Sequence, residues 1–182
     1  RGDQCENCNR TLDASDLIDI RSRSDGSTPV FKDTTHQFFT LGAFQDQLTE
    51  WVTGKDDWRQ NVRNQTLGML REGLHDRAIT RDIEWGIPVP IEGYESKRIY
   101  VWFEAVMGYL SAAIEWAKDS GRPDAWEEFW KDGSTKSYYF IGKDNIPFHT
   151  IIWPAMLMGY GGLNLPYDVP ANEFLSLEDR KF

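Results

Sequence analysis

The chain has 182 residues, 40% of them hydrophobic and 27% charged, a composition typical of one globular domain or of one domain with a small subdomain. It contains no apolar run near the ~18 residues that a membrane-spanning helix needs. Its net charge of −9, without any run of Lys or Arg, argues against a general nucleic-acid-binding surface, because phosphate neutralisation dominates such binding. Two cysteines exclude a disulfide scaffold and favour a reducing, cytoplasmic setting.

Residues 1–36 are polar and rich in turn-forming residues, which predicts a loop-dominated subdomain with short strands at 29–32 and 36–40. The pair Cys5-x-x-Cys8 has the spacing of half a zinc site, but four ligands normally close a structural site. No second pair of this kind is present, and none of the three His stands at ligand spacing. Two reduced surface thiols are therefore the alternative to zinc ligands.

Apolar residues then recur at helical spacing in two consecutive segments, 44–52 and 58–70. Asp57 fits the N-cap of the second helix, and Gly73 is placed to end it. This pattern predicts two short helices joined by a tight turn. The two prolines within 85–90 exclude a regular helix or a central strand there, so we expect an extended crossing segment.

The second half of the chain alternates between β-rich and helical patterns. Strands are predicted at 98–103, at 137–141 and within 168–175, and helices at 106–117 and from Pro147 to about Gly159. This alternation is the signature of an α/β fold with a parallel, doubly wound sheet. Three strands cannot cover both faces of such a sheet, so we expect further strands to come from elsewhere.

Ligands of such sheets bind at the carboxyl ends of the strands, where the segments 102–109 and 142–149 are expected. Gly142 would let a ligand approach the backbone, Asp144 could accept hydrogen bonds from ribose hydroxyls, and the helix N-terminus behind them favours an anion. The alternative is structural: Gly142 ends a strand and Asp144 caps a helix.

The aromatic residues of these segments also allow two interpretations. Trp102 and Tyr109 are either core residues or the walls of a pocket that selects an apolar side chain by shape. His149, on the first turn of its helix, faces either that pocket or the core.

Five stretches of the sequence resemble the methionyl-tRNA synthetases, in the order in which that family has them. They are RGDQCENC at 1–8, DRAITRD at 76–82, WGIPVP at 85–90, YVWFEAVMGY at 100–109 and YFIGKDNIPFH at 139–149. Val106 stands where many members have Pro, Asn145 where many have an aliphatic residue, and 172–175 where many have His-Gly before an aromatic residue. Other class I synthetases share the general layout, but the last two stretches point to methionine.

The resemblance implies a role for each matching residue. The methionine side-chain pocket would be lined by Trp102, Ala105, Tyr109, Phe148 and His149, and ATP or the adenylate would lie beside Gly142, Asp144 and Asn172. Arg81 would bridge the connective peptide to the active site as a catalytic residue. Lys181 would open the KMSKS-type loop, which acts on ATP in catalysis. Cys5 and Cys8 would be two of four zinc ligands.

The resemblance also implies the domain plan. Residues 1–40 would be a connective-peptide remnant with half a zinc knuckle, 41–97 a connection, and 98–182 the second half of a Rossmann-like catalytic domain. The HIGH-type motif that cradles the ATP phosphates is missing and the chain stops where the KMSKS-type loop begins. We therefore expect the fragment alone to be inactive.

The implied activity is the ligation of methionine to tRNA. L-methionine would react with Mg²⁺-bound ATP to give methionyl-adenylate, and tRNA(Met) would then accept the methionyl group, with no covalent nucleophile from this chain and no membrane partner. Catalysis of this kind rests on positioning and on stabilising charge at the phosphoryl centre. The alternatives are a zinc-knuckle binding module and another class I aminoacyl-tRNA synthetase.

Overall fold

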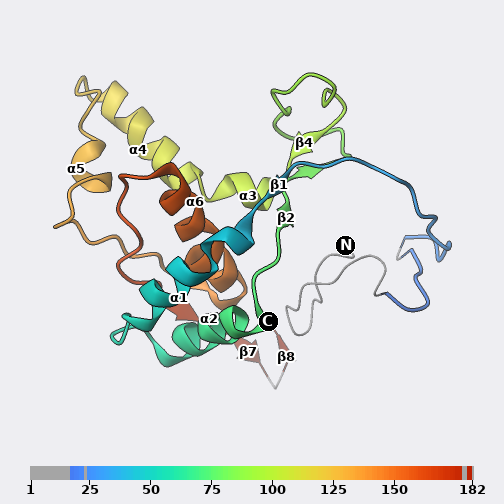
Figure 1. The fold of residues 1–182 in the computed structure, drawn as a ribbon, viewed down its shortest axis with the longest axis horizontal. Coiled ribbons are helices and arrows are strands. Elements are labelled where there is room, and N and C mark those ends of the chain that lie inside the picture. Colours follow the sequence, from blue (N-terminus) through green and yellow to red (C-terminus); the bar gives the residue numbers. More distant parts are fainter. Residues whose placement is uncertain (1–16, 23, 178–179, 182) are drawn as a thin grey trace. The chain divides into compact units, whose positions relative to one another are not determined.

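The computed structural model describes residues 17–22, 24–177 and 180–181, and it divides into two units, Arg1–Thr35 and His36–Phe182 (Figure 1). In the first unit, the described residues form neither helix nor strand, so the strand predicted at 29–32 is wrong. A turn organises part of this unit: the Ser27 carbonyl accepts the Ser22 N–H at 2.8 Å, and Gly26 has the positive φ of 72° that favours glycine. The prediction of a loop-dominated segment is confirmed for the described part.

The second unit begins with two short antiparallel pairs. Strand β1 (Phe38–Phe39) pairs with β2 (Arg77–Ala78), and β3 (Thr80–Arg81) pairs with β4 (Arg98–Ile99). Between β1 and β2 lie η2 (Leu41–Phe44) and the two helices α1 (Gln45–Thr53) and α2 (Gln60–Glu72). We refer to β1–β4 together as the antiparallel ribbon.

Helices α1 and α2 confirm the two predicted periodic segments. Their buried faces meet through Leu48 and Val52 on one side and Val62 and Leu70 on the other. Gly73 ends α2 with φ 89°, as predicted. The predicted N-cap is wrong, because α2 starts only at Gln60 and the N-cap position belongs to Arg59, which makes no side-chain cap bond.

The strand predicted at 98–103 is wrong beyond Ile99. The Tyr100 N–H donates to the Ile79 carbonyl at 2.8 Å, and the Tyr100 carbonyl then accepts the N–H groups of Phe103 and Glu104, which starts helix α3 (Val101–Ala105). The helical turn brings the Phe103 ring to 5.6 Å from Phe39. Aromatic and β-branched residues favour strands, but this long-range packing overrides that preference.

The remaining elements contain one parallel pair. After α4 (Gly108–Asp119) and α5 (Glu127–Trp130), strand β5 (Ile141–Gly142) pairs in parallel with β6 (Ala171–Asn172), and the bridge between Tyr138 and Asp168 extends the pairing. The crossover between β5 and β6 consists of η3 (Lys143–Asn145), η4 (Phe148–Ile152) and α6 (Trp153–Tyr160). Short antiparallel strands β7 (Ser176–Leu177) and β8 (Arg180–Lys181) follow.

The parallel pair confirms the predicted strands at 137–141 and within 168–175, although both are shorter than expected. The segment at 98–103 is not a third parallel strand, because β4 pairs antiparallel with β3. Pro147 and the helix behind it also agree with the prediction, and Gly161, with φ 82°, ends that helix two residues later than expected.

The crossover helix opens with a π-turn over Phe148–Ile152, in which the Trp153 N–H donates to the Phe148 carbonyl five residues earlier. Pro154 explains the wider turn, since proline has no N–H for the usual bond to the carbonyl four residues before it. Such turns occur often at functional sites. Here the π-turn carries the predicted site residues Phe148 and His149.

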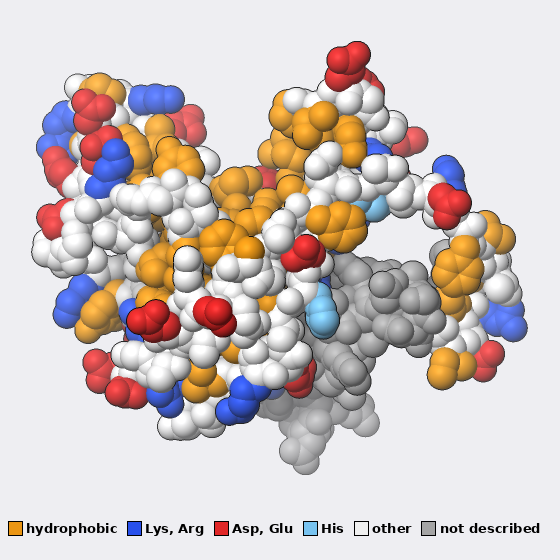
Figure 2. Space-filling model, in the orientation of Figure 1, with side chains coloured by type: hydrophobic (Ala, Val, Ile, Leu, Met, Phe, Trp, Pro, Cys, Tyr) orange, Lys and Arg blue, Asp and Glu red, His pale blue; other side chains and the backbone are white. Residues whose placement is uncertain are grey.

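The core of the second unit joins α1 and α2 to this crossover. The hydroxyls of Thr66 in α2 and Thr150 in η4, both fully buried, lie 2.9 Å apart. Large hydrophobic side chains also reach the surface, and Figure 2 shows many of them on one face. Among the most exposed are Trp85, Phe140 and Tyr160. Among the described residues, we find no helix with the length and apolarity that crossing a bilayer requires.

Candidate functional site

Four of the five predicted methionine-pocket residues come together where α3 and α4 meet the π-turn. Trp102 of α3 and Phe148 of η4 have ring centroids 6.2 Å apart, and Tyr109 of α4 lies with its ring 5.7 Å from that of His149. Ala105, the last residue of α3, is exposed. The segments 102–109 and 142–149, predicted to be neighbours, thus do share one site.

The Tyr109 hydroxyl lies 2.9 Å from His149 Nε2, and His149 Nδ1 lies 2.9 Å from the Asn145 carbonyl oxygen. A carbonyl only accepts hydrogen bonds, so Nδ1 carries the proton, and Nε2 of the neutral ring accepts the Tyr109 O–H. Burial lowers the pKa of His149 below its ordinary value, and the bond to the Asn145 carbonyl opposes that shift. Burial also raises the pKa of Tyr109. Both side chains are therefore neutral at physiological pH.

A third ring, that of Tyr139, packs against both members of this pair. Its centroid lies 5.0 Å from Tyr109 at 82° and 5.7 Å from His149 at 54°. The Tyr139 hydroxyl accepts the Trp153 Nε1–H at 3.2 Å, and the Tyr139 side chain is buried. Burial raises the pKa of Tyr139, while hydrogen bonds from Trp153 and Ser137 act in the opposite direction.

Among the described residues, the site thus presents aromatic faces and the partly exposed phenol of Tyr109. Trp102 and Tyr109 are 46% and 44% exposed, whereas His149 is 5% exposed, so the rings at the front are accessible and the imidazole behind them is not. An apolar, polarisable side chain fits such a wall through dispersion and sulfur–aromatic contacts.

The predicted nucleotide-binding residues lie at the carboxyl ends of the parallel pair. Gly142 is the register partner of Asn172, and η3 with the half-buried Asp144 follows directly. From the start of α2, Arg59 Nη1 donates to Asn172 Oδ1 at 3.2 Å. Next to them, Lys143 forms an ion pair of 2.7 Å with Glu173.

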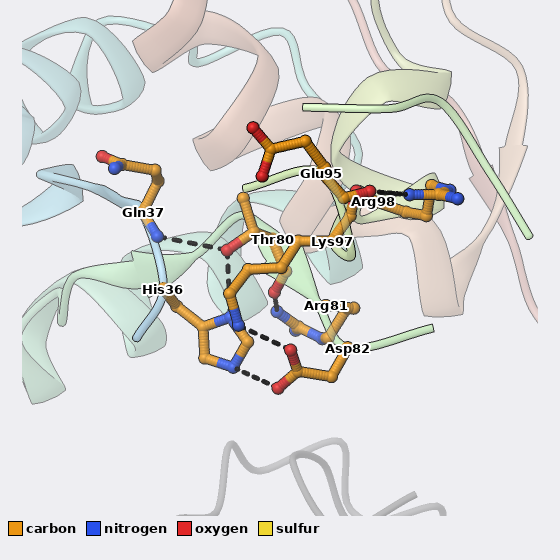
Figure 3. Close-up of polar contacts among 8 residues, drawn as sticks. All are labelled: His36, Gln37, Thr80, Arg81, Asp82, Glu95, Lys97 and Arg98. Carbon is orange, nitrogen blue, oxygen red and sulfur yellow. Dashed lines mark hydrogen bonds and ion pairs between the residues drawn. The ribbon is translucent and has the colours of Figure 1, made fainter. Parts of the chain in front are cut away.

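Arg81 belongs to a different group of polar residues, on the antiparallel ribbon (Figure 3). Its Nη1 donates to the carbonyls of Ala78 and Thr80 at 2.7 and 2.8 Å, and its guanidinium lies 4.1 Å from the Tyr100 ring centroid. The structure thus holds the Arg81 guanidinium against the backbone and an aromatic ring of the ribbon.

The group around Arg81 also contains an ion pair and a histidine. Lys97 Nζ lies 2.5 Å from Asp82 Oδ1, while His36 Nε2 lies 3.7 Å from Asp82 Oδ2 and His36 Nδ1 lies 2.9 Å from the Thr80 hydroxyl. Burial, Lys97 and Arg81 lower the pKa of His36, and Asp82 opposes them. We call His36, Thr80, Asp82 and Lys97 the ribbon cluster.

The sequence profile of the family described as class I tRNA synthetases (M) matches residues 1–182. The chain belongs to this family. It is 63% identical over 182 residues to the methionine–tRNA ligase of Dehalococcoides mccartyi strain 195 and 55% identical to that of Thermoplasma acidophilum. The alignments cover 100% of this chain and 33% of each relative, so the chain spans about a third of the length of the curated relatives that it matches.

Solved structures of the same class of synthetase are similar in fold. Mycobacterium tuberculosis methionyl-tRNA synthetase bound by methionyl-adenylate has a TM-score of 0.65 at 29% identity, over 85% of this chain and 29% of that one. Its apo form has a TM-score of 0.68 at 27% identity, over 95% and 34%. The described elements therefore represent a class I synthetase catalytic fold of helices with a small parallel sheet.

The remaining family-implied residues are placed only in part. Lys181 lies in β8, and Cys5 and Cys8 lie outside the described residues. Within the described ranges, no three His, Cys, Asp or Glu side chains are grouped so that they could hold a metal ion.

Sequence reasoning missed two residues that contact the predicted site, Tyr139 and Arg59. Tyr139 lies in the predicted strand 137–141, where alternation places it on the opposite face from Tyr138 and Phe140; in the structure it is buried and they are exposed. That alternation was a usable signal for a core-facing residue. Arg59 contacts Asn172, which lies 113 positions later in the sequence, and no local sequence pattern predicts such a contact.

Proposed function

We propose that this chain supplies the methionine- and ribose-binding half of the active site of a methionine–tRNA ligase. The observation that carries the proposal is the neutral Tyr109–His149 pair beside Trp102 and Phe148, within a chain that matches the family over its whole length. The relatives are named for this activity and one solved neighbour holds methionyl-adenylate. Because the chain spans 33% of its relatives, the activity is proposed for these residues acting with the rest of such an enzyme.

In this proposal the methionine side chain lies against Trp102, Ala105, Tyr109, Phe148 and His149. The thioether is apolar and polarisable, and a wall of rings selects it by shape and by sulfur–aromatic contact. The Tyr109 hydroxyl is hydrogen-bonded to the buried His149, which fixes the position of the phenol oxygen. A neutral His149 introduces no charge that would have to be desolvated.

The nucleotide lies beside Gly142, Asp144 and Asn172 in this proposal, at the carboxyl ends of a parallel pair. Asp144 accepts hydrogen bonds from the ribose hydroxyls, and Gly142 leaves room for close approach of the ligand. Arg81 and Lys181 act on the reaction from the connective peptide and from the KMSKS-type loop. Mg²⁺ accompanies ATP as the counter-ion of its phosphates, and the methionyl group passes to tRNA(Met).

A zinc knuckle and a cytoplasmic location complete the proposal. The thiolates of Cys5 and Cys8 suit zinc, but they supply two of the four ligands that close a structural site. The other two ligands would have to come from residues outside this chain. The division into 1–40, 41–97 and 98–182 follows the same family plan.

The experiment is a chimaera in which these 182 residues replace the matching third of the Dehalococcoides mccartyi ligase, a relative 63% identical to them. We expect methionine-dependent ATP–pyrophosphate exchange from the chimaera and none above background from the 182 residues alone. The assay is repeated with leucine, isoleucine, valine and cysteine. Preference for one of these over methionine, or turnover by the 182 residues alone, would contradict the proposal.

A further inference from the structure

Tyr109 and His149, which are hydrogen-bonded to each other in the candidate site, come from different elements. Tyr109 lies on the first turn of α4, and His149 lies in the π-turn η4. Their single hydrogen bond of 2.9 Å fixes the distance between the phenol oxygen and Nε2. It does not by itself fix the tilt of either ring, and Tyr109 is 44% exposed.

Tyr139 is the residue that contacts both rings from behind. It lies two residues before β5, on a third segment of the chain, with its ring nearly perpendicular to that of Tyr109 at 5.0 Å and tilted against that of His149 at 5.7 Å. Edge-to-face pairs of this kind contribute about 0.5–1.5 kcal/mol beyond the area they bury. One ring that packs edge-to-face on Tyr109 and tilted against His149 restrains the tilt of both rings together.

Tyr139 is itself firmly held. Its N–H donates to the Asp168 carbonyl at 3.0 Å within the parallel pair, and its hydroxyl accepts the Trp153 Nε1–H at 3.2 Å. Trp153 is 2% exposed and packs edge-on against Trp130 at 5.9 Å. The ring of Tyr139 therefore has a fixed position from which it can restrain its neighbours.

We infer that Tyr139 is a positioning residue for recognition of the amino acid: its ring, rather than its hydroxyl, sets the orientation of the Tyr109–His149 pair. The inference rests on the proposed function, since that pair is proposed to line the methionine pocket. Tyr139 is buried and lies behind the two rings, so it acts through them. Loss of its ring would loosen the pocket wall and leave the nucleotide side intact.

The test compares three substitutions in the chimaera. Tyr139→Met keeps most of the buried volume and removes the ring, Tyr139→Phe keeps the ring, and Tyr138→Met removes the exposed neighbour on the opposite face, which packs against Tyr167. We expect Y139M to raise the KM for methionine about tenfold, as two lost ring contacts imply. The KM for ATP should stay within about twofold in all three variants, and Y139F and Y138M should keep the methionine KM within the same margin.

A structural role without positioning would give a different result. An unchanged methionine KM in Y139M, or an equal rise in the KM for ATP, would overturn the inference. If Y139M does not fold, as judged by thermal melting, Y139L replaces it; failure of both would make Tyr139 a folding residue and also overturn it. An unsubstituted chimaera without methionine-dependent exchange would overturn the proposed function and this inference together, whereas an active chimaera with an unaffected Y139M would overturn this inference alone.

Discussion

The chain holds one histidine in each of two contrasting environments. His149 lies among rings behind the candidate site, with both nitrogens in hydrogen bonds to neutral groups. His36 lies in the ribbon cluster, where Asp82 and Lys97 supply opposite charges. Burial is the main cause of the lowered pKa at both histidines, but only at His36 do nearby charges add to it or oppose it. The first environment suits recognition of an uncharged side chain, and the second suits attachment of one backbone segment to another.

If this contrast is correct, removing the imidazole of His149 should have the largest effect on methionine recognition. His149→Leu deletes the acceptor of the Tyr109 hydroxyl and the donor to the Asn145 carbonyl, leaving buried polar groups unpaired. We expect kcat/KM for methionine in the chimaera to fall about 100-fold, as sites built around hydrogen bonds do when a partner is lost.

The matched control for this substitution is His75→Leu, since His75 is exposed and lies between α2 and β2. Pyrophosphate exchange over a range of methionine concentrations measures both variants. A similar loss in H75L, or wild-type kinetics in H149L, would show that the Tyr109–His149 pair is not the recognition element.

A smaller effect is expected when the charge pair of the ribbon is broken. Lys97 is 8% exposed, and its ammonium lies 2.5 Å from the half-exposed Asp82. Asp82→Asn should destabilise the chimaera by about 1 kcal/mol, because a partly solvated ion pair is worth little more than that. The midpoint of urea denaturation measures the change, and methionine kinetics should stay near wild type.

Asp56→Asn is the control for this prediction, because Asp56 pairs with Arg63 at 3.1 Å while its side chain is 86% exposed. Its effect should be below about 0.5 kcal/mol. A larger loss of stability in D56N than in D82N would mean that burial of Lys97 does not strengthen its ion pair with Asp82.

The two regions also differ in how far sequence could predict them. Helical periodicity, Gly73 and Pro147 are local signals, and the structure contains the helices that they predicted. The proximity of segments 102–109 and 142–149 was predicted from the rule that ligands bind at strand ends, together with the family resemblance. Segment 142–149 does begin at the end of the parallel strand β5, but segment 102–109 follows the antiparallel strand β4, so the rule applies to only one of them. Strands containing β1 and β4 were predicted at 36–40 and 98–103. Strands β2 and β3 and the antiparallel pairing were not predicted, because two-residue strands are too short to show alternation.

Two errors have a common physical origin in distant contacts. Segment 98–103 has strand-like composition, but Phe103 packs against Phe39, 64 positions earlier, and becomes helical. Arg59 reaches Asn172 in the same long-range manner. The π-turn has a local cause instead. Pro154 is visible in the sequence and could have predicted a disturbed helix at this point.

The smallest effect, and the most direct comparison of the two histidines, is the dependence of stability on pH. A histidine whose folded pKa lies below its unfolded value of about 6.5 binds fewer protons when folded, so stability is lost as pH falls below 6.5 toward the folded pKa. Both histidines contribute in this direction. Between about pH 7.5 and 5.5, His149→Gln should remove more of the loss of folding stability than His36→Gln does. Protonated His36 would face the carboxylate of Asp82, which favours the charged form. The groups around His149, which are Tyr109, Tyr139 and the Asn145 carbonyl, offer no negative charge. Urea midpoints at the two pH values measure this, and a larger change in H36Q would reverse the assignment of the charged and the neutral environment.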